Sequence, residues 1–568
     1  MTTTHPGPGA AAPGPAAPGA VPTVPVPTRQ APTVPDEPRR SWRPMVALAL
    51  GQVLMSFNVA ALPVSLGGMV SEFGAPPTTV AMGVVMYGLA VAALVMAGAK
   101  IGQRVGWLRM FRVAVALFAV AQAVMLLAPT VQWVIGAQTL AGATAAIIVP
   151  ALVALIAENY RGTQQATAIG SLGSARAASG VTAFFVGGLL GTFVGWRPVF
   201  GILLVLAVVV LLMSRDLRAD RGDSTVRIDL VGAVLVGAAV VALTLGVNNL
   251  DAWGLLGASE TAPFAIVGLS PAIALVVVGV VLVQTFLVWT RRRTARGEVP
   301  LLDLRVLRSS RERAAVYAMF VIVALEAALN FTVPLYTQIV QGRTPFDTAL
   351  AMMPFNLTVF VAAIVVVRFY RRWSPRRIAI GGFTLSTVAL VWLSVVVTNN
   401  WETLPTILGL VVFGAGQGAL VTLVFNVLVT SSPKELAGDV GSLRGTTQNL
   451  ASAIGTAMAG AILVALLSVG VTRAVTEHPT LPDSVATQAG LDSLDFVSNE
   501  ELEQVLRDAG IPEGQIAETV ATVADARLGA LRSGLLVLAG ISGLAIVPAA
   551  RLPRYRPHEI PDPAPADA

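Results

Sequence analysis

Long apolar runs separated by short polar gaps fill the chain from Met45 to the region before Arg551. A helix needs about 20 apolar residues to cross a bilayer, whereas a strand of a membrane barrel needs only roughly 9–11. Since lipid offers no hydrogen bonds to the backbone, runs of this length are predicted to be helices. The predicted spans are residues 44–65, 78–98, 110–128, 132–156, 165–190, 198–213, 228–248, 264–289, 314–340, 346–367, 378–397, 404–430, 438–468 and 529–549.

Arginine and lysine fall in alternate gaps between these runs. Cations flank the first run and follow the second, fourth, sixth, eighth and tenth, whereas the gaps at 66–77 and 249–263 hold none. Basic residues accumulate in cytoplasmic loops, so both termini are expected in the cytoplasm of a protein of the cell membrane. Two termini on one side require an even number of spans, which favours fourteen over thirteen.

The same charge pattern predicts how the spans are grouped. The basic gaps at 99–109 and 368–377 each follow the second span of a set of six, which is typical of two parallel halves. The fold class expected is all-α and integral to the membrane. The predicted parts are a disordered tail at 1–41, an N-terminal half at 42–213, a linker at 214–227, two inserted helices at 228–290, a linker at 291–313, a C-terminal half at 314–550 and a tail at 551–568.

One long acidic loop, residues 469–528, is expected on the outer side. It contains two stretches of helical character, 499–509 and 514–528, with Pro512 between them. A solvated cap and a specific binding role are both open for this loop.

Composition excludes several classes of function. Only 12% of the 568 residues are charged, against roughly 25% in soluble domains. The net charge of +6 does not indicate nucleic acid, because the basic residues lie in short loops beside apolar spans. The chain has no cysteine, and its three histidines lie outside the spans, so no metal or other cofactor is expected. Neither a phosphate-binding loop nor a nucleophile–base pair is present, so we expect neither ATP-driven transport nor an enzyme.

Several stretches, in this order along the chain, resemble the major facilitator superfamily, in particular its fourteen-helix drug-efflux branch, over about residues 42–550. They are 187–197 (GGLLGTFVGWR), 227–232 (RIDLVG), 300–308 (PLLDLRVLR), 333–355 (VPLYTQIVQGRTPFDTALAMMPF) and 433–460. The resemblance implies a major facilitator fold of two six-helix halves plus two inserted central helices, and transport by alternating access.

The functional signatures of that branch are altered here. In the loop 99–109 (AKIGQRVGWLR), Gln103 replaces the usual acid, while Arg104 and Gly106 remain, and these three are the expected cytoplasmic gate residues. Gln138 stands where the family has an intramembrane arginine. The other altered positions are Leu54, Ala183, Phe184 and Gln448. The family's proton antiport therefore does not carry over directly.

Two charges interrupt the apolar spans near their middle, Arg176 and Glu326. They lie about 11 and 12 residues past the inner ends of their helices, so at ~1.5 Å per residue both are roughly 16–18 Å deep. An unpaired charge there costs at least about 2.5–3.5 kcal/mol. Glu326 is the candidate titrating or cation-binding group, with Asn330 one turn later on the same face. Arg176 is its candidate counter-ion or holds an anionic headgroup, although a purely structural pair is also open.

Asn58 and Gln138 are weaker candidates for the substrate site. A lone polar side chain in a membrane helix more often makes an interhelical hydrogen bond, worth about 0.6 kcal/mol on average.

Three functions remain open. The first is a secondary exporter of hydrophobic or amphiphilic small molecules, driven by protons. The second is a transporter of lipids or lipid precursors without the usual proton relay. The third is a membrane partner protein that transports nothing. In each case the lipid bilayer is an expected partner and the chain is expected to be a monomer. A transporter would also bind its small-molecule substrate, and the proton-driven exporter would bind protons.

Overall fold

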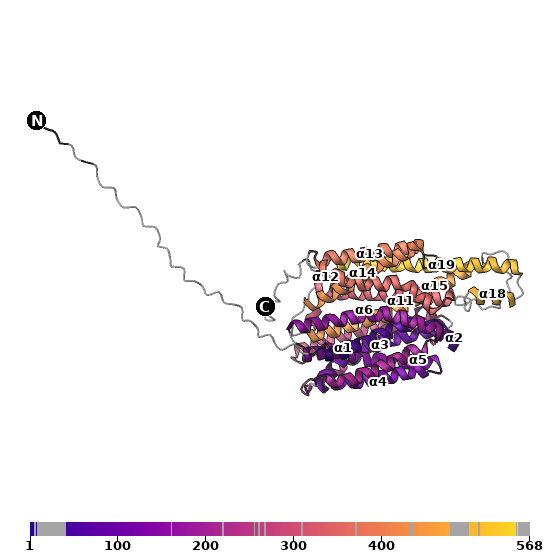
Figure 1. Cartoon of the computed structure of the whole chain (residues 1–568), viewed down its shortest axis with the longest axis horizontal. Helices are drawn as coiled ribbons and strands as arrows, with labels where there is room; N and C mark the ends of the chain where they lie inside the picture. Colours follow the sequence, from indigo (N-terminus) through magenta and orange to yellow (C-terminus); the bar gives the residue numbers. More distant parts are fainter. Residues whose placement is uncertain are drawn as a thin grey trace. The chain divides into compact units, whose positions relative to one another are not determined.

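The computed structural model describes residues 1–4, 7, 41–160, 162–218, 221–254, 256–259, 262–265, 268–307, 310–369, 372–430, 437–476, 499–508, 512–552 and 554. Most of the predicted tails at 1–41 and 551–568, and the centre of the predicted outer loop, 477–498, lie outside these residues. All the helices belong to the compact unit that begins at Trp42 (Figure 1).

The first six long helices form one packed set. α3 packs on α5, α4 packs on both α5 and α7, and α1 packs on α6. A short helix, α2 (Leu66–Phe73), follows α1 in the gap 66–77, which holds no basic residue. The six are α1 (Arg43–Val64), α3 (Pro77–Val105), α4 (Trp107–Leu127), α5 (Val131–Asn159), α6 (Gly162–Phe193) and α7 (Arg197–Met213).

The last six long helices repeat this pairing. α12 packs on α14, α13 packs on α14 and α19, and α11 packs on α15. A π turn, η3 (Tyr336–Val340), continues α11, and the short α20 (Ile546–Ala549) follows α19. The six are α11 (Ser310–Leu335), α12 (Pro345–Phe369), α13 (Pro375–Val396), α14 (Leu404–Thr430), α15 (Ala437–Thr476) and α19 (Glu513–Leu544). The two sets therefore have the same internal arrangement, as two structural repeats do.

Two further long helices, α8 (Leu230–Asn248) and α10 (Pro271–Ala295), lie between the sets in sequence and pack on each other. The sets meet along two seams, α3 against α15 and α6 against α12, and α8 contacts both helices of the first seam. Short elements link these helices: η1 (Ser214–Asp216), α9 (Leu250–Trp253) and η2 (Leu304–Leu307). The inserted pair thus borders one seam through α8.

Thirteen of the described helices are long and apolar enough to cross a membrane. The remaining predicted span, 165–190, lies in α6, whose apolar part is Ala178–Phe193. Together they form the all-α membrane fold expected from the sequence. The second inserted helix begins at Pro271 rather than at 264, because Ser270 Oγ caps it by accepting from Ala272 N at 3.1 Å.

The outer loop also differs from its prediction. α15 extends to Thr476, and the predicted helix 514–528 is not separate, because α19 runs without a break from Glu513 into the last span. The other predicted helix is α18 (Asn499–Asp508), which packs on α19. The acidic segment is therefore partly an extension of two membrane helices.

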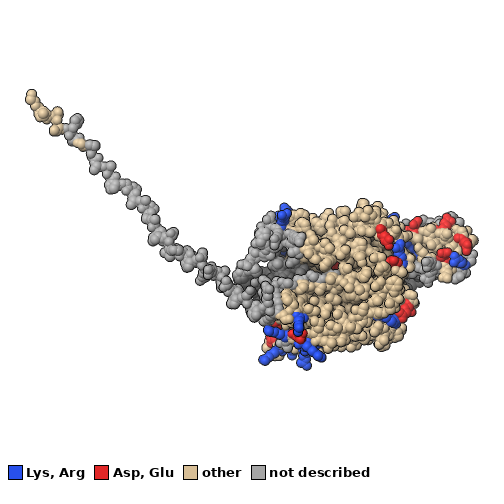
Figure 2. All heavy atoms as spheres, viewed as in Figure 1, with Lys and Arg blue, Asp and Glu red and all other residues tan. Residues whose placement is uncertain are grey.

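Charged side chains gather at the two ends of the helix bundle and leave an uncharged band between them (Figure 2). Apolar side chains are exposed along this band, among them Val205, Val234 and Val395. We call the end that carries Arg109, Arg218, Arg292 and Arg377 the arginine-rich end. The opposite end carries α2 and α18 (Figure 1).

Candidate functional site

Three amides form a hydrogen-bonded polar cluster inside the first six-helix set. Asn58 Nδ2 donates to Gln138 Oε1 at 2.8 Å, and Gln122 Nε2 donates to Asn58 Oδ1 at 3.3 Å. All three side chains are fully buried. The structure brings the predicted pair Asn58 and Gln138 together, but there they satisfy each other, which favours the structural interpretation.

In the described part of the second set, comparable polar atoms lack hydrogen-bond partners. Asn330 Oδ1, Thr446 Oγ1 and both amide atoms of Gln417 are buried without a hydrogen-bond partner among the described residues. Proteins rarely leave such groups unpaired, and each exception calls for a reason. Ser65 Oγ and Gln122 Oε1 of the first set are also unpaired, but the second set holds more unpaired buried polar atoms among the described residues.

Gln417 points into the interior of the second set. On α14, Gly414 and Gly418 face α12, whereas Gly416 faces α13. At about 100° per residue, Gln417 lies between these faces and opposite the exposed Leu408. Glu326 is on α11, which packs against α14. We infer that the Gln417 amide is on the side of α14 that is turned toward α11. No charge marked this position in the sequence, and only its polarity within an apolar run could have revealed it.

Arg176 of α6 and Glu326 of α11 come from different sets and interact electrostatically across the bundle. Both side chains are half-buried. No ion pair or hydrogen bond between the two is found among the described contacts. The structure therefore brings the two predicted charges within electrostatic range without direct pairing. Asn330 follows Glu326 by one turn of α11, as predicted.

A second arginine belongs to the same group of charges. Arg444 of α15 is half-buried and repels Arg176 electrostatically. Tyr87 of α3, which is buried, also lies within the field of Arg176. Sequence reasoning missed Arg444, although an arginine inside the predicted span 438–468 was the available signal.

The predicted gate residues lie elsewhere, at the arginine-rich end. Gln103 and Arg104 end α3, and Gly106 separates α3 from α4 with a φ of 106° that favours glycine. The linker after α7 packs on their backbone, since Asp223 N donates to Gln103 O at 2.9 Å. A Cβ on Gly222 would lie 2.7 Å from Arg104 O. Their described contacts are therefore with their own half.

The linker before α11 also approaches α3. Burial alone would raise the pKa of Asp303, but hydrogen bonds from Arg305 and the charges of Arg305 and Lys100 lower it. Lys100 lies near the end of α3, so a carboxylate of the second linker lies within the field of the first half. The two linkers thus converge on the same end of α3.

At the opposite end the two halves are in direct contact. Gly67 N of α2 donates to Gln338 Oε1 of η3 at 2.8 Å, and Gln338 Nε2 donates to Pro63 O at 3.4 Å. A Cβ on Gly67 would lie 2.7 Å from that Oε1 atom. The absence of a side chain at Gly67 is therefore what lets Gln338 bridge the halves.

The seam between α6 and α12 is equally close at this end. Phe346 N donates to Thr192 Oγ1 at 3.0 Å. A Cβ on Gly188 would lie 2.6 Å from Ala349 Cβ and 2.9 Å from Pro345 O. Backbone approach at Gly188 thus closes this end of the seam.

An open, mostly apolar groove of about 310 Å³ lies between α11 and α15. Val316, Phe320 and Leu450 supply apolar walls, and Arg313 and Thr446 supply polar groups. Sequence reasoning did not identify this groove, because it depends on how the two helices pack.

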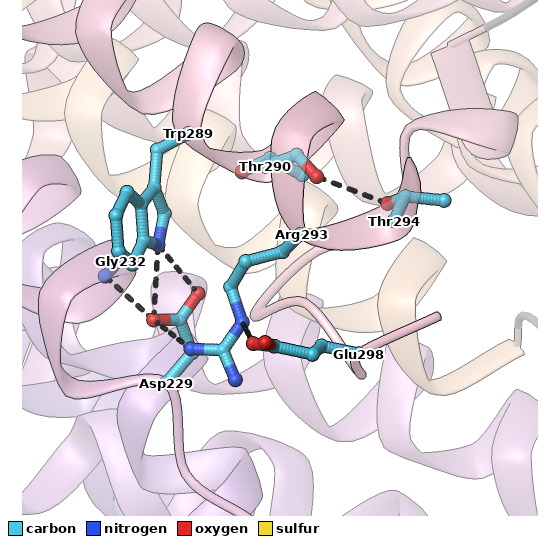
Figure 3. A network of polar contacts seen from close by, with 7 residues as sticks. All are labelled: Asp229, Gly232, Trp289, Thr290, Arg293, Thr294 and Glu298. Atoms are coloured by element: carbon cyan, nitrogen blue, oxygen red, sulfur yellow. Dashed lines mark hydrogen bonds and ion pairs between the residues drawn. The ribbon is translucent and has the colours of Figure 1, made fainter. Parts of the chain in front are cut away.

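A polar cluster joins the two inserted helices at the arginine-rich end (Figure 3). Asp229, 1% exposed, caps α8 by accepting from Gly232 N and also accepts from Trp289 Nε1 of α10 at 3.2 Å. Arg293 forms an ion pair with it at 2.9 Å and a second with Glu298 at 3.1 Å. We call Asp229, Trp289, Arg293 and Glu298 the clamp of the inserted helices.

Sequence comparison gives a family match. The family model described as Major Facilitator Superfamily matches residues 48–456. The chain is 25% identical over 430 residues to the multidrug efflux pump LfrA of Mycolicibacterium smegmatis, covering 75% of this chain and 82% of that protein. It is 26% identical over 428 residues to the tetracenomycin C resistance and export protein of Streptomyces glaucescens, covering 75% and 76%.

Solved structures support the fold. A bacterial homologue of the human lysosomal transporter Spinster, in an inward-facing and unoccupied conformation, matches with a TM-score of 0.58 and 14% identity. The match covers 92% of this chain and all of that one. An auto-inhibited peptide transporter of the POT family matches with a TM-score of 0.57 and 13% identity, covering 92% and 99%. At these identities the likeness concerns the fold alone.

Proposed function

Because the chain belongs to the Major Facilitator Superfamily, we propose that this transporter exports hydrophobic or amphiphilic small molecules by alternating access. The observation that carries the proposal is the arrangement of the halves. They are in contact at the end of Gln338 and Gly188, while Arg176 and Glu326, one from each half, interact electrostatically without an ion pair among the described contacts. Rocking of one half against the other would change the surroundings of both charges. The export relatives support the direction of transport.

Proton coupling is assigned to Glu326. Glu326 lies in the middle of a described membrane helix and interacts electrostatically with Arg176 of the other half. A neutral carboxyl is far less costly at this depth than a charged one. When protonated, the carboxyl becomes a donor, and Asn330 Oδ1 on the same helix face is a buried acceptor in need of one. When ionised, Glu326 is balanced by Arg176. The two states thus have different partners on different halves.

The arginine-rich end is assigned to the cytoplasm under the positive-inside rule. Both termini then lie inside, in the cell membrane, and the contacts of Gln338 and Gly188 close the outer side. In this orientation the structure corresponds to a state whose outer gate is shut. The gate role of Gln103, Arg104 and Gly106 would be exercised at the inner end. The chain is proposed to work as a monomer, with each half acting as one rigid unit.

A second function, transport of lipids or lipid precursors, is favoured by the groove between α11 and α15. Its apolar walls with Arg313 among them suit an amphiphile with an acidic headgroup. Such a transporter would not need the proton relay that the altered signatures weaken.

Transport by the purified chain in vesicles tests these assignments. For a proton-driven exporter, movement of an amphiphilic dye follows an imposed pH gradient, and Glu326→Gln abolishes that dependence. Glu402→Gln, which changes an exposed acid, is the matched control. Lipid movement that ignores the gradient would support the second function. Movement of neither substrate would contradict both and favour a non-transporting membrane partner.

A further inference from the structure

We propose that the exported molecule is an anionic amphiphile and that Arg176 binds its negative group between the halves. The inference rests on the proposed function and adds to it the charge of the substrate. It is carried by the positions of three charged side chains and by the open polar atoms around them.

Arg176 carries a charge within the membrane-spanning part of α6. It lies far from either end of α6 (Gly162–Phe193), is half-buried, and has neither a hydrogen bond nor an ion pair among the described contacts. A guanidinium in the middle of a membrane helix is costly without a partner. Its planar set of donors matches a carboxylate, sulfonate or phosphate, to which it can donate two parallel hydrogen bonds. Arg176 is therefore suited to bind an anion from outside its own helix.

The group of charges around Arg176 contains two arginines and one acid. Glu326 attracts Arg176 without pairing directly, and Arg444 adds positive charge from α15. Apart from Glu326, the acidic residues of the described membrane helices lie near helix ends, as Glu312 and Asp347 do, or in the outer part of α19, as Asp525 does. A cationic substrate would meet both arginines, whereas an anionic one would meet a single carboxylate that protonation can neutralise.

The apolar body of the substrate also needs a binding surface. The helices that carry Glu326 and Arg444 also form the apolar groove, where Val316, Phe320 and Leu450 can contact a hydrophobic body. Asn330 Oδ1 and Thr446 Oγ1 on the same helices are buried without partners among the described residues, so they can bond a hydroxyl or amide of the substrate. An acid with an apolar body and a few polar groups fits these features together.

Binding of three fluorescent probes to the purified full chain tests the proposal. The probes share one aromatic body and carry a sulfonate, a neutral amide or a quaternary ammonium group. We expect the sulfonate probe to bind about 10-fold or more tighter than the neutral one, the gain of one charge-assisted hydrogen-bonded contact. Arg176→Gln should remove that gain and leave the neutral probe unchanged, whereas Arg176→Lys should keep part of it.

Two controls keep the result interpretable. Arg218→Gln removes an exposed arginine and should change nothing, and Arg444→Gln should weaken the sulfonate probe by a smaller factor than Arg176→Gln. Unchanged binding of the neutral probe shows that each variant is folded. Tighter binding of the ammonium probe, or a preference for sulfonate that survives Arg176→Gln, overturns the proposal. Gradient-driven export of the ammonium probe would also overturn the proposal of an anionic substrate, but it would leave the proposed exporter function intact. Transport of none of the probes would contradict the proposed exporter function itself.

Discussion

Glu326 differs from the other buried polar residues because its charge can be removed by one proton. Replacing it with glutamine mimics the protonated form, in which the side chain can donate to Asn330. We expect Glu326→Gln to bind substrate but to lose export driven by a pH gradient. Dye efflux from vesicles with and without the gradient measures the effect, and gradient-driven efflux equal to that of the unaltered chain would exclude Glu326 as the proton carrier.

Gln417 and Gln138 are predicted to respond in opposite ways to the same change. Gln417 is buried with both amide atoms unpaired, so Gln417→Leu removes an unsatisfied group that costs roughly 1–3 kcal/mol and should raise the melting temperature. Asn58 Nδ2 donates to Gln138 Oε1, so Gln138→Leu leaves this buried donor without its acceptor and should lower the melting temperature. Thermal unfolding of both variants in one detergent checks the signs. A lower melting temperature for Gln417→Leu would show that its amide has a stabilising partner.

At the scale of residues, the sequence identifies candidate charged residues in the membrane more readily than it predicts hydrogen-bond partners. Arg176 and Glu326 were found because a charge in an apolar run has a clear cost. Arg444 was missed although it lies inside the predicted span 438–468, because it is near the inner end of that span and not near its middle. Whether an amide is satisfied depends on helices far apart in the sequence, as the bond between Asn58 and Gln138 illustrates, so the difference between Gln138 and Gln417 could not be predicted.

Among the elements, the inserted pair depends on the clamp (Figure 3). Asp229→Ala removes the cap of α8 and leaves Arg293 without its buried partner. Loss of a cap costs about 0.5–2 kcal/mol, and breaking a buried pair up to about 3–5 kcal/mol. We expect a clearly lower melting temperature, measured by intrinsic fluorescence. Asp223→Ala, at an exposed carboxylate, is the control, and equal melting temperatures for the two variants would contradict a stabilising clamp.

Close approach of α6 and α12 predicts that Gly188→Val prevents closure at that end, since even a Cβ would meet backbone. Spin labels at Ser71→Cys and Asn400→Cys, both exposed, report the distance between the halves there. We expect the distribution to shift to longer distances and export to fall. Gly136→Val is the matched control, because a Cβ there has no neighbour within 4 Å. An unchanged distance distribution would show that the seam can accommodate the side chain.

The bounds of the helices could be predicted from the sequence only in part. The bounds of a helix were predicted closely where the length of the apolar run sets them, as for α14 (Leu404–Thr430). Errors arose where local chemistry decides, as at Ser270 and Pro271, which set the start of α10. The helical character of 514–528 was predicted, but its continuity with the last span was missed, because this outer part is too polar to belong to an apolar run and packs on α18.

At the scale of the whole molecule, the alternation of charge predicts two six-helix sets, and their matching internal contacts agree with it. The charge pattern does not predict which helices form the seams between the two sets. Close backbone contacts at Gly67 and Gly188, and the bridge made by Gln338, depend on tertiary geometry. The end at which the halves meet could therefore be learned only from the structure.

Orientation in the membrane is the property on which the inner and outer assignments depend. The chain has no cysteine, so a single introduced thiol gives an unambiguous signal. Ser224→Cys lies in the linker at the arginine-rich end and Ala517→Cys on the acidic extension of α19, and both positions are exposed. If basic loops face the cytoplasm, a membrane-impermeant maleimide should label Ala517→Cys in intact cells and Ser224→Cys only after permeabilisation. The unaltered chain controls for background. The reverse pattern would invert the topology and turn the closed end toward the cytoplasm, whereas labelling of both thiols in intact cells would contradict the odd number of spans between the linker and the extension or reveal mixed insertion.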